Sequence, residues 1–287
     1  MEPSEIRHVG VVGAGLMGSG IVEVCARAGL RVTFIEGSDE LVGAGRGRVE
    51  RSVRRAVERG KLDAAAADAA LGRIDGASDL TALAPVDLVI EAATEDREAK
   101  RAIFARLGEV TRPEVVLGSN TSSIPIALLG EASGRPDRVL GMHFFNPPPV
   151  MALLELTPSD ATSDETYELV RAFGTEVLGK ICVRSKDEAG FIVNRLLVPY
   201  LFDAIRLQEA GFATREDIDT AMRLGLGHPM GPLELSDLIG LDTLLSIGEV
   251  LREAFPTDPR YEPPALLRRL VDEGRLGRKS GGGFYGA

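Results

Sequence analysis

The residue pair with the clearest chemical potential is a histidine and a glutamate on either side of a proline-rich turn. His143 and Glu155 lie in VLGMHFFNPPPVMALLELTP, twelve residues apart, and their midpoint is Pro149. If the flanking runs pair as a hairpin about that residue, the two face each other with Cα atoms about 4.5–5.5 Å apart. The carboxylate would then fix the tautomer of the imidazole and raise its basicity, which suits a general base. The alternative is a buried structural histidine whose hydrogen-bonding groups are satisfied by a neighbouring residue.

A glycine-rich segment follows the first strand-like run. Its sequence, GAGLMG, has GxGxxG spacing and comprises the candidate cofactor-binding residues Gly13, Gly15, Leu16, Met17 and Gly18. In this pattern the first glycine permits a tight turn, the second lets a pyrophosphate approach the backbone, and the third lets the helix pack closely on the strand. Glu36 ends the next strand-like run, 23 residues after Gly13, where an acid would accept the ribose hydroxyls and repel a 2′-phosphate. The pattern predicts NAD as cofactor in preference to NADP.

A polar run, Asn120 to Ser123, lies between the strand-like segment Val115–Leu117 and a helical one. Such residues are ordinary helix caps. They also follow the carboxyl end of a strand, where open α/β sheets bind ligands. From the residues alone, a helix-capping role and a catalytic role are equally possible for this run.

The elements that must position these groups alternate between short β-branched runs and helical stretches up to about Val183, which predicts βαβ units around a mostly parallel sheet. After Arg184–Gly190 only helical periodicity remains. We therefore expect an α/β, Rossmann-type domain over residues 1–187 and an all-α domain over residues 188–287. The predicted strands are Val9–Val12, Val32–Ile35, Val86–Ile90, Val115–Leu117, Val139–Phe145, Leu153–Leu156 and Ile181–Val183.

Two capping boxes predict helix starts, one at Thr162 with Glu165 and one at Thr214 with Asp217. The segment Gly190–Gly211 is apolar on almost every side. A helix of that kind must be covered all round, and a second copy of the chain is the simplest cover. The helical domain is thus expected to form a homodimer.

Composition excludes several classes of function. Lys and Arg number 33 against 43 Asp and Glu, so the net charge of −10 disfavours nucleic-acid partners. Two cysteines, Cys25 and Cys182, cannot build a disulfide framework or a Cys-rich zinc site, so we predict no metal and a reducing, cytoplasmic setting. Acids at positions 2 and 5 and an early strand-like pattern lead us to expect no targeting peptide, and no stretch reaches the about 18 apolar residues of a membrane span.

Taken in order, the motifs resemble the NAD-dependent 3-hydroxyacyl-CoA dehydrogenases in their short stand-alone form, which includes 3-hydroxybutyryl-CoA dehydrogenases. The resemblance covers nearly the whole chain. It is carried by SNTSS (Ser119–Ser123), HFFNP (His143–Pro147), KDEAGFIVNRLLVPY (Lys186–Tyr200), MGPLELSDLIGLD (Met230–Asp242) and GRKSGGGFY (Gly277–Tyr285).

This resemblance implies a role for each matching residue. His143 would be the general base and Glu155 its partner, while Ser122 and Asn194 would contact substrate oxygens. Further cofactor contacts are implied at Glu36, Glu95, Lys100, Ser122, Asn146 and Lys279. Without the resemblance, Glu95, Lys100 and Lys279 would be interpreted as solvated charges.

A basic segment offers a site for the phosphates of an acyl-CoA substrate. Residues 46–61 carry seven basic and two acidic side chains, and Arg48, Arg51, Arg55 and Arg59 fall on one helix face. The resemblance implies coenzyme A contacts at Ser52 and at Arg59, where the family commonly has Lys. The alternative is a solvated helix face.

Two other functions remain open on the sequence. One keeps the fold but acts on a free hydroxy acid or sugar acid, as gulonate dehydrogenases do. The other is a crystallin-like protein without turnover, against which the intact His143 and Glu155 count. Acyl-chain length and pathway do not follow from the residues.

Overall fold

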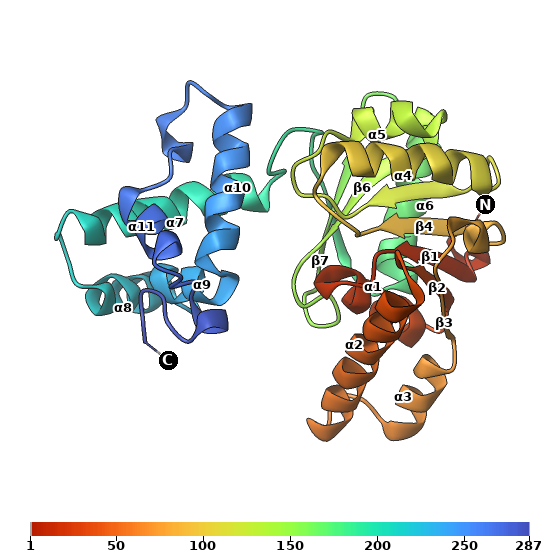
Figure 1. The fold of residues 1–287 in the computed structure, drawn as a ribbon, viewed down its shortest axis with the longest axis horizontal. Helices are drawn as coiled ribbons and strands as arrows, with labels where there is room; N and C mark the ends of the chain where they lie inside the picture. Colours follow the sequence, from red (N-terminus) through yellow and green to blue (C-terminus); the bar gives the residue numbers. More distant parts are fainter. Residues whose placement is uncertain (1, 287) are drawn as a thin grey trace. The chain divides into compact units, whose positions relative to one another are not determined.

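The chain folds into two compact units that divide between Glu188 and Ala189. A computed structural model describes residues 2–286, and Figure 1 shows a sheet-containing first unit and a helical second one. The predicted fold class, a mostly parallel sheet domain followed by a helical domain, is confirmed.

The first unit is built on a single eight-stranded sheet in the order β3-β2-β1-β4-β5-β6-β7-β8. Only the β6–β7 pair is antiparallel. Each of the seven predicted runs overlaps a strand, so these predictions are confirmed. The strands are β1 His8–Val12, β2 Arg31–Ile35, β3 Ile74–Ala77, β4 Leu88–Glu91, β5 Val116–Ser119, β6 Val139–Phe144, β7 Leu153–Pro158 and β8 Ile181–Arg184.

Strand β3 is absent from the predicted strands, and its place in the sheet explains why. It lies at one edge and pairs with β2 alone, so Asp75 and Gly76 face solvent and break the apolar pattern. The central strands β1 and β4 are buried along their whole length, as expected for parallel strands covered on both faces.

Helices cover both faces of this sheet (Figure 1). One apolar cluster holds buried residues of α1, α2, α3 and α6, and a separate cluster holds those of α4 and α5. The two clusters form the core on either side of the strands. The helices are α1 Leu16–Arg27, α2 Asp39–Glu58, α3 Ala64–Leu71, α4 Arg97–Val110, α5 Ile126–Ser133 and α6 Asp164–Ala172.

One of the two predicted capping boxes is wrong. Helix α6 is capped by Ser163, whose hydroxyl accepts from Thr166 N, whereas the hydroxyl of Thr162 donates to the backbone oxygen of Val139 on the adjacent strand. The hydroxyl of Thr162 also accepts from Ser159 N, at 2.9 Å, so it is engaged outside the helix in both roles. The other cap is confirmed, because Thr214 accepts from Asp217 N at the start of α8.

The second unit packs helices around its own apolar cluster. Helix α7 is Val193–Glu209, and the others are α8 Arg215–Leu226, α9 Pro232–Ile239, α10 Leu241–Ala254 and α11 Ala265–Asp272. Helix α7 buries Val198, Leu201 and Phe202 in this cluster, while Leu196 is 70% exposed. The unit therefore covers only part of the apolar surface of α7. Among residues 2–286, no helix is long and apolar enough to cross a membrane.

Candidate active site

The antiparallel pair β6–β7 brings the predicted histidine and glutamate together. His143 and Glu155 are direct partners in its register, so the predicted hairpin register is confirmed. Nδ1 of His143 lies 2.8 Å from Oε2 of Glu155. Both residues are buried, and Glu155 has no exposed surface. When Nδ1 donates to the carboxylate, the lone pair of the neutral ring lies on Nε2, where a proton can be accepted.

An aromatic ring further restricts the imidazole. The rings of His143 and Phe145 have centroids 4.7 Å apart and planes tilted by 59°. The carboxylate of Glu155 and this ring together limit the rotation of the histidine. Such a pre-oriented base needs little reorganisation when it accepts a proton.

The glycine loop has the shape that a dinucleotide requires. Gly13 has a φ of +86°, and a Cβ there would lie 2.5 Å from the Cα of Ala93. A Cβ on Gly18 would lie 1.8 Å from the carbonyl oxygen of Gly13, so the helix approaches the loop as closely as backbone atoms allow. At Gly15, the N-cap of α1, a Cβ would meet no heavy atom within 4 Å among residues 2–286, its own chain neighbours aside. A pyrophosphate thus has room to reach the helix N-terminus.

Glu36 follows β2 and is tied to the same loop. Its Oε1 accepts a hydrogen bond of 2.6 Å from Ala14 N. Its Oε2 accepts none from the residues that the structure describes. The loop and this carboxylate therefore fit an adenosine dinucleotide with free ribose hydroxyls.

The polar run after β5 does not cap helix α5. That role belongs to Asp187, whose two carboxylate oxygens accept from Ile126 N and Ala127 N at 2.7 and 2.9 Å. Ser122 instead donates from Oγ, at 3.1 Å, and from N, at 2.8 Å, to Oε1 of Glu95. The capping interpretation of this run is thus excluded for α5, and Ser122 lies at the carboxyl edge of the sheet.

Asn120 links this run to the strand that carries the histidine. Its Oδ1 accepts from Phe144 N at 2.8 Å. The residues around Ser122 and those around His143 are therefore held together within the first unit.

Lys100, which resembles a solvated charge in the sequence, is only 2% exposed. Its Nζ lies 2.7 and 2.6 Å from the two oxygens of Glu91 and 3.8 Å from Oε2 of Glu95. The interpretation as a solvated charge is wrong for Lys100. Sequence reasoning missed Glu91, because a single acid at a strand end has no distinguishing pattern.

The turn after β6 carries Asn146 at the surface and packs against the cofactor-loop helix. A Cβ on Gly20 of α1 would lie 2.6 Å from Cδ of Pro148, so turn and helix are in close contact. Lys180, which is buried, donates to the backbone oxygens of Pro148 and Met151, both at 2.7 Å. Burial lowers the pKa of Lys180. No sequence signal points to this lysine.

The basic face of α2 divides into two parts. Arg48 donates to the backbone oxygen of Ala14 at 3.1 Å, so it supports the glycine loop. Ser52, Arg55 and Arg59 are exposed near the far end of the helix. Arg48 is exposed too, but one of its guanidinium nitrogens is engaged by the loop, whereas the distal part of the face makes no such contact among the described residues.

Two predicted residues belong to the second unit. Asn194 is buried in the first turn of α7. Lys279 pairs with Asp242, with Nζ 2.5 Å from Oδ1.

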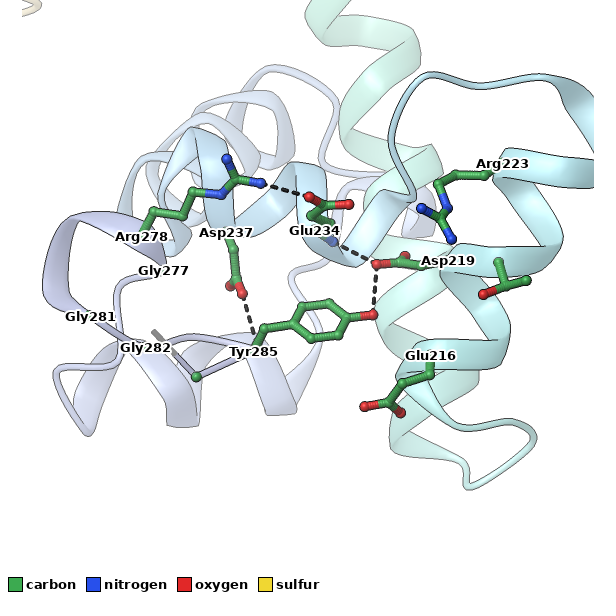
Figure 2. Close-up of a pocket in the computed structure, with 12 residues that line it drawn as sticks. Glu216, Asp219, Arg223, Glu234, Asp237, Gly277, Arg278, Gly281, Gly282 and Tyr285 are labelled. Atoms are coloured by element: carbon green, nitrogen blue, oxygen red, sulfur yellow. Dashed lines mark hydrogen bonds and ion pairs between the residues drawn. The ribbon is translucent and has the colours of Figure 1, made fainter.

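A pocket of about 400 Å³ in the second unit contains none of the predicted site residues (Figure 2). Its acids hold the C-terminal segment: Asp219 accepts from the hydroxyl of Tyr285, and Asp237 accepts from Tyr285 N. Arg278 pairs with Glu234 at 2.7 Å. The two aspartates thus accept from neutral donors and the arginine pairs with a glutamate, contacts that hold the fold of the unit.

Within residues 2–286, no group of three His, Cys, Asp or Glu side chains could hold a metal ion.

Known proteins resemble this chain over nearly its full length. A 3-hydroxybutyryl-CoA dehydrogenase of Mycobacterium tuberculosis (strain CDC 1551 / Oshkosh) is 53% identical over 281 residues, covering 98% of each chain. The human mitochondrial hydroxyacyl-coenzyme A dehydrogenase is 41% identical over 98% of this chain and 91% of its own.

Solved structures agree with these relatives. The crystal structure of FadB2 of M. tuberculosis has a TM-score of 0.96 and 53% identity, covering 98% of this chain and 99% of its own. That of the (S)-3-hydroxybutyryl-CoA dehydrogenase PaaH1 of Ralstonia eutropha has a TM-score of 0.92 and 45% identity over the same shares.

Two family descriptions divide the chain between them. Residues 8–188 match the 3-hydroxyacyl-CoA dehydrogenase, NAD binding domain, and residues 190–287 match the C-terminal domain of the same family. With the dinucleotide loop and the buried histidine–glutamate pair in place, the chain belongs to the NAD-dependent 3-hydroxyacyl-CoA dehydrogenase family.

Proposed function

We propose that the chain catalyses the reversible, NAD-dependent oxidation of (3S)-3-hydroxyacyl-CoA to 3-oxoacyl-CoA, with His143 as general base. The observation that carries this proposal is the hydrogen bond of 2.8 Å between Nδ1 of His143 and the buried carboxylate of Glu155. That bond supports a neutral imidazole whose Nε2 accepts protons.

In the oxidation direction, Nε2 of His143 removes the proton of the C3 hydroxyl. Glu155 stabilises the imidazolium that forms, because a carboxylate at hydrogen-bond distance favours the charged ring. NAD, when bound, supplies the nicotinamide that exchanges a hydride with C3. In the reverse direction the imidazolium returns the proton to the carbonyl oxygen.

The proposed cofactor contacts begin at the glycine loop. The glycine loop would receive the pyrophosphate and Glu36 the ribose, supported by the open space at Gly15 and by the second oxygen of Glu36. The remaining proposed contacts are Leu16, Met17, Glu95, Lys100, Ser122, Asn146 and Lys279. Lys100 would act mainly through Glu95, because its ammonium group is buried against Glu91.

For the substrate, we propose Ser122 and Asn194 as contacts to the acyl oxygens, and Ser52 and Arg59 as contacts to coenzyme A. The exposure of Ser52 and Arg59 at the distal part of α2 supports the second pair. Relatives named as 3-hydroxybutyryl-CoA dehydrogenases support a short acyl chain.

We also propose a homodimer formed through the helical unit. Its described residues expose large apolar side chains, among them Leu196 of α7, Phe212 after it, and Leu224 and Leu226 of α8. Such a surface favours association. Light scattering tests the proposal, and a monomer at micromolar concentration contradicts it. Two free cysteines support the proposed cytoplasmic location.

A spectrophotometric assay with acetoacetyl-CoA and NADH tests the function. We expect NADH oxidation that requires the thioester. Turnover of free hydroxy or sugar acids without turnover of acetoacetyl-CoA would favour the gulonate dehydrogenase-like alternative, and no turnover of either would favour a non-catalytic relative.

A further inference from the structure

Glu91 occupies the centre of the carboxyl edge of the sheet. It is the last residue of β4 and lies in register between Val12 of β1 and Ser119 of β5. Its side chain is 0% exposed. The residue is therefore adjacent to the start of the glycine loop on one side and of the polar run on the other.

The carboxylate of Glu91 binds three separate parts of the first unit. Its oxygens accept from Lys100 Nζ of α4, at 2.7 and 2.6 Å, and from Ser119 Oγ of β5, at 2.8 Å. Oε1 also accepts from Ala93 N, at 2.8 Å, in the turn that follows β4. These donors lie in α4, in β5 and in the turn after β4.

The turn held by Glu91 supports the glycine loop. Ala92 N donates to the backbone oxygen of Val12 at 2.7 Å, and the Cα of Ala93 lies 2.5 Å from where a Cβ on Gly13 would be. A displacement of this turn would displace the loop.

The lysine held by Glu91 reaches Ser122 through a second carboxylate. Lys100 Nζ lies 3.8 Å from Oε2 of Glu95, and Oε1 of Glu95 accepts from both N and Oγ of Ser122. Charges of alternating sign thus lead from Glu91 to the hydroxyl that we propose for substrate binding.

Stability alone is a weak reason for this arrangement. A buried ion pair costs desolvation energy, and apolar side chains of similar volume often stabilise a fold as well or better. Such a pair does fix the direction of its hydrogen-bond partners, which apolar contacts do not.

We propose that Glu91 is a positioning residue for the reaction. Through Lys100 and Ala93 it holds the Glu95–Ser122 pair and the glycine loop in fixed relation to each other. The inference rests on the proposed function, because that function is what gives Ser122 and the loop their roles.

A double-mutant cycle between Glu91→Gln and Ser122→Ala tests the proposal. Glu91→Gln keeps the shape and removes the charge that holds Lys100. We expect kcat/KM for acetoacetyl-CoA to fall, and the effect of Ser122→Ala to be about five-fold smaller in the Glu91→Gln background than in the wild type. The Kd of NADH, measured by fluorescence, should rise in Glu91→Gln.

Glu23→Gln is the matched control. Glu23 is also a buried carboxylate of the first unit, 1% exposed, and pairs with Arg27 at 3.0 Å, but it contacts neither Ser122 nor Lys100. We expect it to lower the Tm while the effect of Ser122→Ala stays the same in its background. If the effect of Ser122→Ala on kcat/KM is the same in the Glu91→Gln and Glu23→Gln backgrounds as in the wild type, the proposal is overturned. Glu91 would then only stabilise the fold.

Two further measurements keep the inference falsifiable. If Glu91→Gln does not fold, Ser119→Ala removes a single donor to Glu91, and an unchanged Kd and kcat/KM in that variant would contradict the proposal. If the wild type does not turn over acetoacetyl-CoA, the proposed function fails. The double-mutant cycle between Glu91→Gln and Ser122→Ala, measured on the Kd of NADH, then tests the role of Glu91 separately. Additive effects of the two substitutions on this Kd would contradict the proposal.

Discussion

Asp187 caps the first turn of helix α5 although 61 residues separate it from Ile126, whose N–H it accepts at 2.7 Å. Burial raises the pKa of Asp187, and the charge of Asp160 adds to the shift, while the two backbone N–H groups oppose it. The segment that precedes the second unit is thus fastened to the helix that follows Ser122.

The raised pKa predicts a pH dependence of stability. The pKa of Asp187 is 3.8 in the unfolded state and higher in the folded state, so the folded state retains this proton to higher pH. The free energy of unfolding therefore falls as pH rises from 3.8 through the raised pKa. Asp187→Asn lacks this dependence and loses one cap acceptor, which costs about 0.5–2 kcal/mol. Urea unfolding should show a larger difference between wild type and variant at low pH than at neutral pH. A difference that grows toward neutral pH contradicts the assignment.

The contact between Asp187 and Ile126, compared with that between His143 and Glu155, shows which parts of the site a sequence can predict. The His143–Glu155 register follows from a local turn, so the symmetry about Pro149 is sufficient to predict it. The cap on α5 comes from a residue far along the chain, and no local pattern predicts it.

Burial of charges is equally hidden in the sequence. Lys100 lies in a segment rich in acids and bases, which is typical of a solvated helix, and only the sheet brings Glu91 beneath it. The central parallel strands are predictable because they are apolar throughout, whereas the edge strand β3 carries polar residues.

Cofactor preference tests the role of Glu36. We expect kcat/KM to be higher for NADH than for NADPH, because the carboxylate repels a 2′-phosphate. Glu36→Ser should reduce the preference for NADH over NADPH. It should also raise the Kd of NADH, since Ala14 N loses its hydrogen-bond partner. Glu40→Ser, on the exposed first turn of α2, is the control. It should change neither the cofactor preference in kcat/KM nor the Kd of NADH. Equal kcat/KM for both cofactors in the wild type would refute the assignment.

The division of the basic face of α2 predicts two different phenotypes. Arg59→Ala should raise the KM for acetoacetyl-CoA and weaken its dependence on salt, because a solvated phosphate contact is screened. Arg48→Ala should raise the Kd of NADH instead, because Arg48 supports the glycine loop at Ala14. Steady-state kinetics and fluorescence titration separate the two effects. Identical phenotypes would mean that the face acts as one surface.

Glu155 should act through His143 alone. Glu155→Gln keeps the shape but removes the charge that supports the imidazolium, so kcat should fall. In the double variant with His143→Gln, the loss should be little greater than for His143→Gln, since a partner cannot assist an absent base. Fully additive losses in kcat would show that the two residues act independently.

The most direct test of the account is the single-turnover rate of NADH oxidation by acetoacetyl-CoA in His143→Gln. We predict a fall of about 10²–10⁴-fold, the usual contribution of a general acid–base, with the Kd of NADH nearly unchanged. A rate equal to that of the wild type would contradict the account, because the 2.8 Å contact between His143 and Glu155 would then serve the fold and not the chemistry.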